Sequence, residues 1–81
     1  MMITLRYFAG AREAAGVENE PIEAPEGADV AAVRALVAER HAALVPLLPR
    51  CALAVNRAYA TERTPLRDGD ELALLPPVGG G

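Results

Sequence analysis

Only one stretch of this 81-residue sequence has both the apolar spacing and the length of an amphipathic helix. Apolar residues recur at helical intervals from Val30 to Val37, and charged residues fall on the opposite side. Asp29 stands where an N-cap is expected, and the helix is predicted to end near His41–Ala43. A single helix of this length can cover one face of a sheet, so the remaining elements are expected to form that sheet.

The segments on either side of this helix have the two-residue periodicity and the turn residues of short strands. Met2–Phe8 alternates, with Phe8 on the face opposite to the apolar odd-numbered positions. Residues 17–24 predict a second strand, which Pro21 confines to a sheet edge or a bulge, and residues 9–16 predict a short helical turn or a loop. Beyond the helix, a proline-broken connection leads to predicted strands at 51–55, 58–60 and 71–75.

The order of these elements predicts an α+β fold. A first hairpin, one main helix and two or three late strands are arranged most simply as a mixed sheet with the helix packed on one face. In that sheet the first and last strands are parallel neighbours at the centre, which is the β-grasp (ubiquitin-like) arrangement. We therefore predict one domain over residues 1–76, followed by a flexible C-terminal tail over residues 77–81.

The end of the sequence departs furthest from what a folded core requires. Pro76 and Pro77 stop a strand because they lack backbone donors, and Gly79–Gly81 offer no side chain to bury. Such a segment is thin enough to enter a narrow tunnel, and it reaches on the order of 15 Å beyond Pro77. Two interpretations stay open: a frayed terminus, or an arm that presents the Gly81 carboxylate to another protein's active site.

Composition narrows the classes of function. The net charge of −3 argues against nucleic acid as a partner, and no apolar run approaches the ~20 residues of a membrane span. The single cysteine excludes an intramolecular disulfide, and the N-terminus lacks the features of a signal peptide, so we expect a cytoplasmic protein. All eight basic residues are arginine and lysine is absent, a bias that a GC-rich genome also produces. The chain therefore has no side-chain amine that could capture an activated Gly81.

Four motifs match one family at the same relative positions. They are Phe8-Ala9-x-x-Arg12-Glu13, Val55-Asn56, Pro65-Leu66-x-Asp68-Gly69-Asp70-Glu71-Leu72, and the closing Pro76-Pro77-Val78-x-Gly80-Gly81. Over its full length the chain resembles the small subunit of molybdopterin synthase, the MoaD family of ubiquitin-like sulfur carriers. It departs from the family pattern at Leu74-Leu75, where aromatic residues are common, and at Gly79, where Ser or Thr is common.

The resemblance implies a chain that is not an enzyme by itself but the sulfur-donating subunit of a sulfurtransferase complex. It implies that a MoeB-like enzyme uses Mg-ATP to adenylate Gly81, after which sulfur replaces one oxygen to give a thiocarboxylate. The tail would then enter the large subunit, MoaE, of a heterotetramer and donate sulfur to cyclic pyranopterin monophosphate in molybdenum cofactor biosynthesis. The chain itself is expected to bind no cofactor. The alternatives are a thiazole-pathway (ThiS-like) carrier and a ubiquitin-like protein modifier.

Strand phase and the resemblance together predict a partner-binding surface. Phe8, Tyr59 and Leu75 fall out of phase with the core and are expected to form an apolar patch beside the tail, although single exposed apolar residues are also normal. Arg12 either pairs with a partner carboxylate or stays solvated. The tail completes the predicted set with Pro76, Pro77, Val78, Gly79 and Gly80.

Three further features have simpler structural interpretations, and we predict no metal site. Cys51, in an apolar strand, is interpreted as a small core residue rather than a persulfide carrier. His41 lies near a helix end, where the dipole favours it, and has no partner ligand in sequence. Asp68, Asp70 and Glu71 are typical of an Asp-Gly turn rather than a magnesium site.

Overall fold

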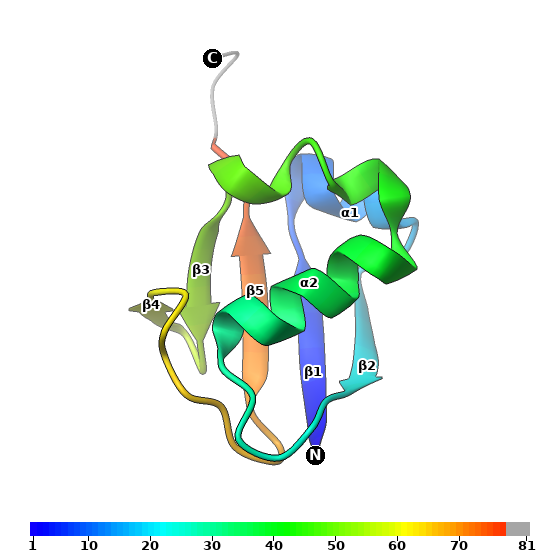
Figure 1. The fold of residues 1–81 in the computed structure, drawn as a ribbon. Helices are drawn as coiled ribbons and strands as arrows, with labels where there is room; N and C mark the ends of the chain where they lie inside the picture. The colour runs from blue at the N-terminus through cyan, green and yellow to red at the C-terminus, as the bar shows by residue number, and fades with distance from the viewer. Residues whose placement is uncertain (78–81) are drawn as a thin grey trace.

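The computed structural model describes residues 1–77, and the predicted tail residues Val78–Gly81 lie outside the described part. Along the chain the elements are β1 (Met2–Tyr7), α1 (Ala9–Ala15), β2 (Asn19–Glu23), α2 (Val30–Arg40), the 3-10 turns η1 (Ala42–Leu44) and η2 (Leu48–Arg50), β3 (Ala52–Val55), β4 (Ala58–Ala60) and β5 (Glu71–Leu75). The five strands form one mixed sheet in the order β2-β1-β5-β3-β4. β1 pairs in parallel with β5 at its centre, which confirms the predicted β-grasp arrangement (Figure 1).

The main helix α2 crosses one face of the sheet, as Figure 1 shows. Its N-cap is Asp29, as predicted, because the Asp29 Oδ1 accepts the backbone N–H of Ala32 at 2.9 Å. The preceding helical amides donate instead to carbonyls of the loop after β4, Val30 to Thr64 and Ala31 to Glu62. The start of the helix is thus tied to a segment that lies far along the chain.

The predicted helical turn after β1 is a complete short helix. α1 has seven residues and ends at Gly16, whose φ of 79° lies in the left-handed region that glycine adopts readily. Ala11 is buried in the common core, and α1 packs against η1 as well as β1. The fold therefore has a second, smaller helix beside the one main helix that the sequence predicts.

The edge position of β2 is confirmed. β2 pairs only with β1, and Pro21 lies opposite Thr4 in an antiparallel register. Because proline lacks an N–H, it is tolerated at an edge and not in the middle of a sheet. The Pro21 carbonyl accepts a hydrogen bond of 2.9 Å from Arg40 Nη1, so the last residue of α2 reaches this edge.

The core lies between α2 and one face of the sheet. Side chains of β1 and β5 that alternate toward the helices are fully buried: Ile3, Leu5, Tyr7, Leu72 and Leu74. The helix contributes Val30, Val33 and Val37. Cys51 precedes β3 and is partly buried against this cluster, which agrees with its interpretation as a small apolar residue.

Candidate docking site

The face of the sheet opposite the helices is lined by the side chains that the core does not use. In β1 these are Arg6 and, directly after the strand, Phe8; in β5 they are Glu71, Ala73 and Leu75. They alternate with the residues of the core cluster because successive side chains in a strand point to opposite faces, and the small Ala73 is buried on this second face. We call this the open face.

A groove on the open face lies at the base of the tail. One part is lined by Phe8, Ala9, Arg50, Ala52, Tyr59, Leu75, Pro76 and Pro77. The adjoining part follows β5 back toward its start and adds Arg6, Ala54, Arg57, Glu71 and Ala73 to the shared Phe8, Tyr59 and Leu75. Five residues predicted from the sequence therefore lie together here, in segments far apart along the chain.

The three residues of the predicted apolar patch differ in exposure. Tyr59, on the short edge strand β4, is 84% exposed, whereas Phe8 and Leu75 are partly buried. Tyrosine with one exposed ring is typical of interface anchors, because it offers a large apolar area and a polar tip. The role of these residues in partner binding remains a prediction.

Three arginines line the groove around these apolar side chains, and they were not among the site residues predicted from the sequence. The Arg6 guanidinium lies 5.0 Å from the centroid of the Phe8 ring and 3.8 Å from a Glu71 carboxylate oxygen. Arg50 and Arg57 line the groove at its other borders. Arg6 has the same strand phase as Phe8 and was predictable, whereas Arg50 and Arg57 are brought to the groove only by the path of β3 and its hairpin turn.

Two groups of predicted site residues are not part of the described groove. Arg12 is exposed on α1 and lines neither part of the groove, so its pairing with a partner remains a prediction. Val78, Gly79, Gly80 and Gly81 lie outside the described residues.

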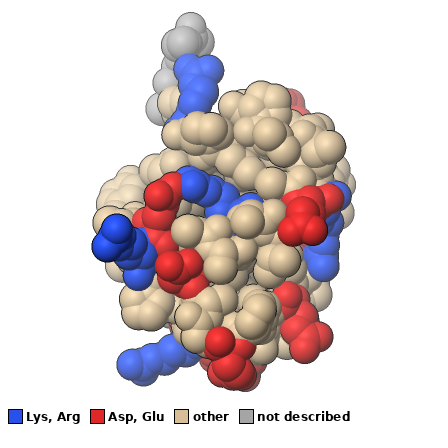
Figure 2. Space-filling model, viewed as in Figure 1, with Lys and Arg blue, Asp and Glu red and all other residues tan. Residues whose placement is uncertain are grey.

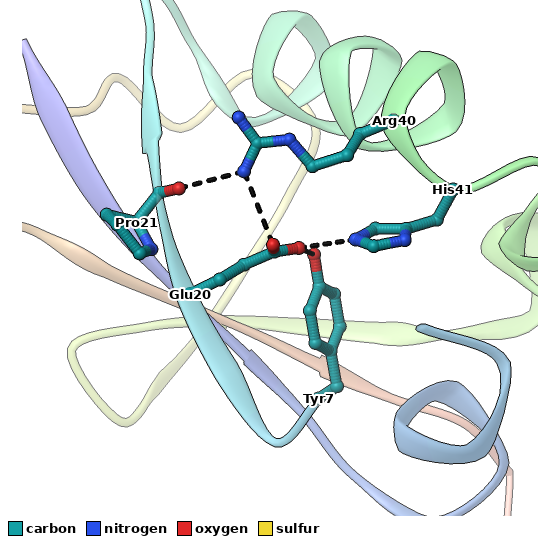
Figure 3. Close-up of polar contacts among 5 residues, drawn as sticks. All are labelled: Tyr7, Glu20, Pro21, Arg40 and His41. Carbon is teal, nitrogen blue, oxygen red and sulfur yellow. Dashed lines mark hydrogen bonds and ion pairs between the residues drawn. The ribbon is translucent and has the colours of Figure 1, made fainter. Parts of the chain in front are cut away.

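A polar cluster that the sequence did not predict occupies the helical face (Figure 3). The carboxylate of Glu20 accepts a hydrogen bond from the Tyr7 hydroxyl at 2.7 Å, and its same oxygen, Oε2, lies 2.5 Å from His41 Nε2. Arg40 Nη1 lies 3.4 Å from the other oxygen. The Tyr7 and His41 rings meet edge to face, with centroids 5.7 Å apart. The cluster joins the end of α2 to β1 and the edge strand β2.

The protonation of this cluster follows from its geometry. Burial, the hydrogen bond to Glu20 and the Glu20 charge raise the pKa of Tyr7 well above its ordinary value, against a smaller opposing effect of Arg40, so the phenol keeps its proton and donates. For Glu20, partial burial favours the neutral acid, but hydrogen bonds from Tyr7 and His41 and the nearby positive charge of Arg40 outweigh it and lower the pKa. Since an ionised carboxylate only accepts, His41 Nε2 is the donor.

The acidic turn before β5 is engaged with the protein itself. Asp68 Oδ1 accepts the Met2 N–H at 2.7 Å, and the two Asp70 oxygens accept from the Asn56 side chain and the Arg67 N–H. These bonds hold the pKa of Asp70 below its usual value. Among residues 1–77, no three His, Cys, Asp or Glu side chains gather as metal ligands would.

The surface seen from the helical side mixes both signs of charge. In Figure 2, red and blue side chains are interspersed over a largely uncharged surface, without a continuous basic region among the described residues on view. Within that described part of the chain, neither helix is long and apolar enough to cross a membrane.

The mixed five-stranded sheet and the helix that crosses it define a ubiquitin-like β-grasp domain. The sequence model of the ThiS family matches residues 5–81, and the chain belongs to this family. The chain is 37% identical over 83 residues to the molybdopterin synthase sulfur carrier subunit of Chlamydomonas reinhardtii, with 100% of each chain covered.

Two solved structures extend the comparison. A subunit of the complex of subunits 1 and 2 of molybdopterin-converting factor from Helicobacter pylori is 38% identical, with a TM-score of 0.75 and 100% of both chains covered. SAMP1, the small archaeal modifier protein 1, from Haloferax volcanii superimposes with a TM-score of 0.91 at 26% identity, again with 100% of both chains covered.

Proposed function

We propose that this chain is the sulfur carrier subunit of a molybdopterin synthase, and that Gly81 is its working residue. The observation that carries the proposal is the end-to-end match, over 100% of both chains, to a relative named molybdopterin synthase sulfur carrier subunit. The match is accompanied by the Pro76-Pro77-Val78-x-Gly80-Gly81 ending, which follows the central strand β5 directly.

In the proposed mechanism one protein activates the C-terminal glycine so that it can accept sulfur, and the tail then donates that sulfur inside a second protein. A carboxylate is a poor electrophile, so an adenylating enzyme that uses Mg-ATP first places AMP on Gly81 as a leaving group. Sulfide-level sulfur from the donor then attacks the acyl carbon, the C–O bond to AMP breaks with its electron pair on AMP, and a thiocarboxylate remains, which is a good nucleophile at neutral pH. The large subunit encloses this tail and orients it toward the pterin precursor, with water excluded.

The chain's own contribution is docking and presentation. The groove at the base of the tail supplies an apolar floor from Phe8, Leu75 and Tyr59, which suits a partner's apolar contact surface. Arg50 and Arg57 add positive charge that suits acidic residues at the rim of that surface. The subunit complex from Helicobacter pylori supports a large-subunit partner of this kind.

The test is the intact mass of the protein after incubation with Mg-ATP, an adenylating enzyme and a sulfur donor. The expected product carries one sulfur in place of one oxygen, at Gly81. Protein that stays unmodified under conditions that convert a known carrier would contradict the proposal. Addition of a large subunit and precursor then distinguishes this role from thiazole-pathway transfer, since only the former forms a dithiolene.

A second candidate, a protein modifier, is favoured by the likeness to SAMP1. It predicts conjugates in which Gly81 forms an isopeptide bond with lysines of other proteins. Higher-mass species that carry this chain in cells, absent when Gly80 and Gly81 are deleted, would support it.

A further inference from the structure

An activated C-terminal carbonyl reacts with any nucleophile it meets, including those of its own chain. If a lysine amine attacked the Gly81 acyl-adenylate, a C–N bond would form, the bond to AMP would break with the electron pair on AMP, and the amine would lose a proton. The product, an isopeptide, cannot carry sulfur. Positive charge for docking is most simply supplied by lysine or arginine. In a groove at the base of the tail, however, a lysine would also be a nucleophile close to the activated carbonyl.

All the basic residues that line the groove are arginines. Arg50 lines the groove together with Pro76 and Pro77, and Arg6 and Arg57 border its continuation. The guanidinium keeps its positive charge at all working pH values and is not a nucleophile, whereas a lysine ammonium loses its proton readily enough to act as one. Arg50 is exposed, so its identity is not required by packing.

The Met1 amine is held away from the tail. Met1 N donates to the Ala24 carbonyl at 2.7 Å and lies 3.7 Å from Glu26 Oε1. Figure 1 shows the N-terminus at the end of the sheet where β5 begins, opposite to the end from which β5 leads into the tail. Tyr7 pairs with Leu74 near the end of β5, and it lies six residues, about 20 Å along the strand, from Met1. This distance exceeds the ~15 Å that an extended tail can reach beyond Pro77.

The thiol of Cys51 also points away from the groove at the base of the tail. Ala52 pairs with Leu75, so Cys51 lies beside the start of the tail in the register of β3 and β5. Its side chain nevertheless packs against the core on the helical side, away from the groove that Ala52 lines. Burial raises the pKa of this thiol, with Arg34 opposing weakly, which keeps it in the unreactive protonated form.

We propose that arginine at position 50, together with the placement of Met1 and Cys51, determines the fate of the activated tail. The groove keeps its positive charge for docking but offers no amine or thiol, so these groups of its own chain do not capture the acyl group and it stays available to a nucleophile supplied by another protein. This inference rests on the proposed function, in which Gly81 is activated.

The test activates Gly81 without any enzyme, so its outcome is independent of whether an adenylating partner accepts this chain. The 81-residue protein is prepared as a C-terminal thioester by intein cleavage and incubated at mildly basic pH. Intact mass follows two products, the hydrolysed acid and self-acylated protein. The variants are Arg50→Lys, at the tail base, and Arg67→Lys as the matched control, at an exposed position before β5.

Wild type should only hydrolyse. Arg50→Lys should form an internal amide at least about ten-fold faster than Arg67→Lys, because the amine at position 50 lies near the start of the tail. Equal rates in the two lysine variants would overturn the role of position 50. Self-acylation of the wild type would overturn the inference as a whole. If the wild type forms a self-acylated product that dithiothreitol cleaves, Cys51→Ser tests its origin. Loss of that product in Cys51→Ser would assign it to the Cys51 thiol.

Discussion

The two faces of this sheet are built from alternate residues of the same strands, yet they differ in how fully their side chains are engaged within the chain. On the helical face, the carboxylate of Glu20 is paired with Tyr7 and His41 above fully buried strand residues. On the open face, the groove keeps an apolar floor with Tyr59 almost fully exposed. We therefore expect substitutions on the helical face to change the free energy of unfolding, and substitutions on the open face to change partner binding.

The largest effect on function is expected from the last two glycines of the sequence. Deletion of Gly80 and Gly81 should abolish sulfur transfer and leave the melting temperature unchanged, since the core cluster is formed by residues 3–74. Thiocarboxylate formation by mass spectrometry and thermal unfolding measure the two effects. Transfer that persists in the truncated protein would remove the basis of the proposed function.

The comparison of the faces is tested most directly by two neighbours in β5. Leu74→Ala removes a fully buried side chain of the helical face and should lower the free energy of unfolding by about 2–5 kcal/mol. Leu75→Ala, on the open face, should cost about 1 kcal/mol but weaken binding to the large subunit. Urea unfolding and calorimetric titration measure these quantities, and equal losses of stability would contradict the contrast between the faces.

The polar cluster should make stability depend on acid pH. The pKa of Glu20 is lowered in the folded protein, so its stabilising effect is complete above the ordinary value of 4.5 and is lost as the pH falls through the folded-state pKa. Glu20→Gln should therefore reduce stability by about 1 kcal/mol at neutral pH, with the difference from wild type shrinking in acid.

Urea unfolding between neutral and acid pH measures this difference. The matched control is Glu23→Gln, because Glu23 is exposed on the same strand β2. A loss of stability in Glu20→Gln that stays constant with pH would argue against the ionised carboxylate as the source.

The smallest effect on stability is expected at the most exposed aromatic residue. Tyr59→Ala should change the free energy of unfolding by no more than about 0.5 kcal/mol, because a side chain that is 84% exposed buries little on folding. Its binding to the large subunit should still weaken, by about 1–2 kcal/mol, if Tyr59 anchors the interface. Unchanged affinity would limit the docking surface to Phe8, Leu75 and the tail base.

The order of elements was predictable because each depends on local signals. The alternation of Met2–Phe8, the Asp29 cap and the edge position of Pro21 all act through neighbouring residues, and the structure confirms each. The boundaries moved by one or two residues where the signal was weak, since β2 begins at Asn19 and β3 at Ala52. The prediction that Phe8, Tyr59 and Leu75 fall outside the core also came from strand phase.

The sequence by itself thus determined the strand phases, the helix and its cap, and the glycine-rich end, because these follow from periodicity and from single-residue chemistry. Only the tertiary structure brought Glu20 to His41, 21 residues away, and Arg50 and Arg57 to the two parts of the groove on the open face. Such contacts depend on how β2, α2 and β3 are placed relative to one another. A hydrogen bond or a shared groove requires a spatial approach that local spacing along the chain does not contain.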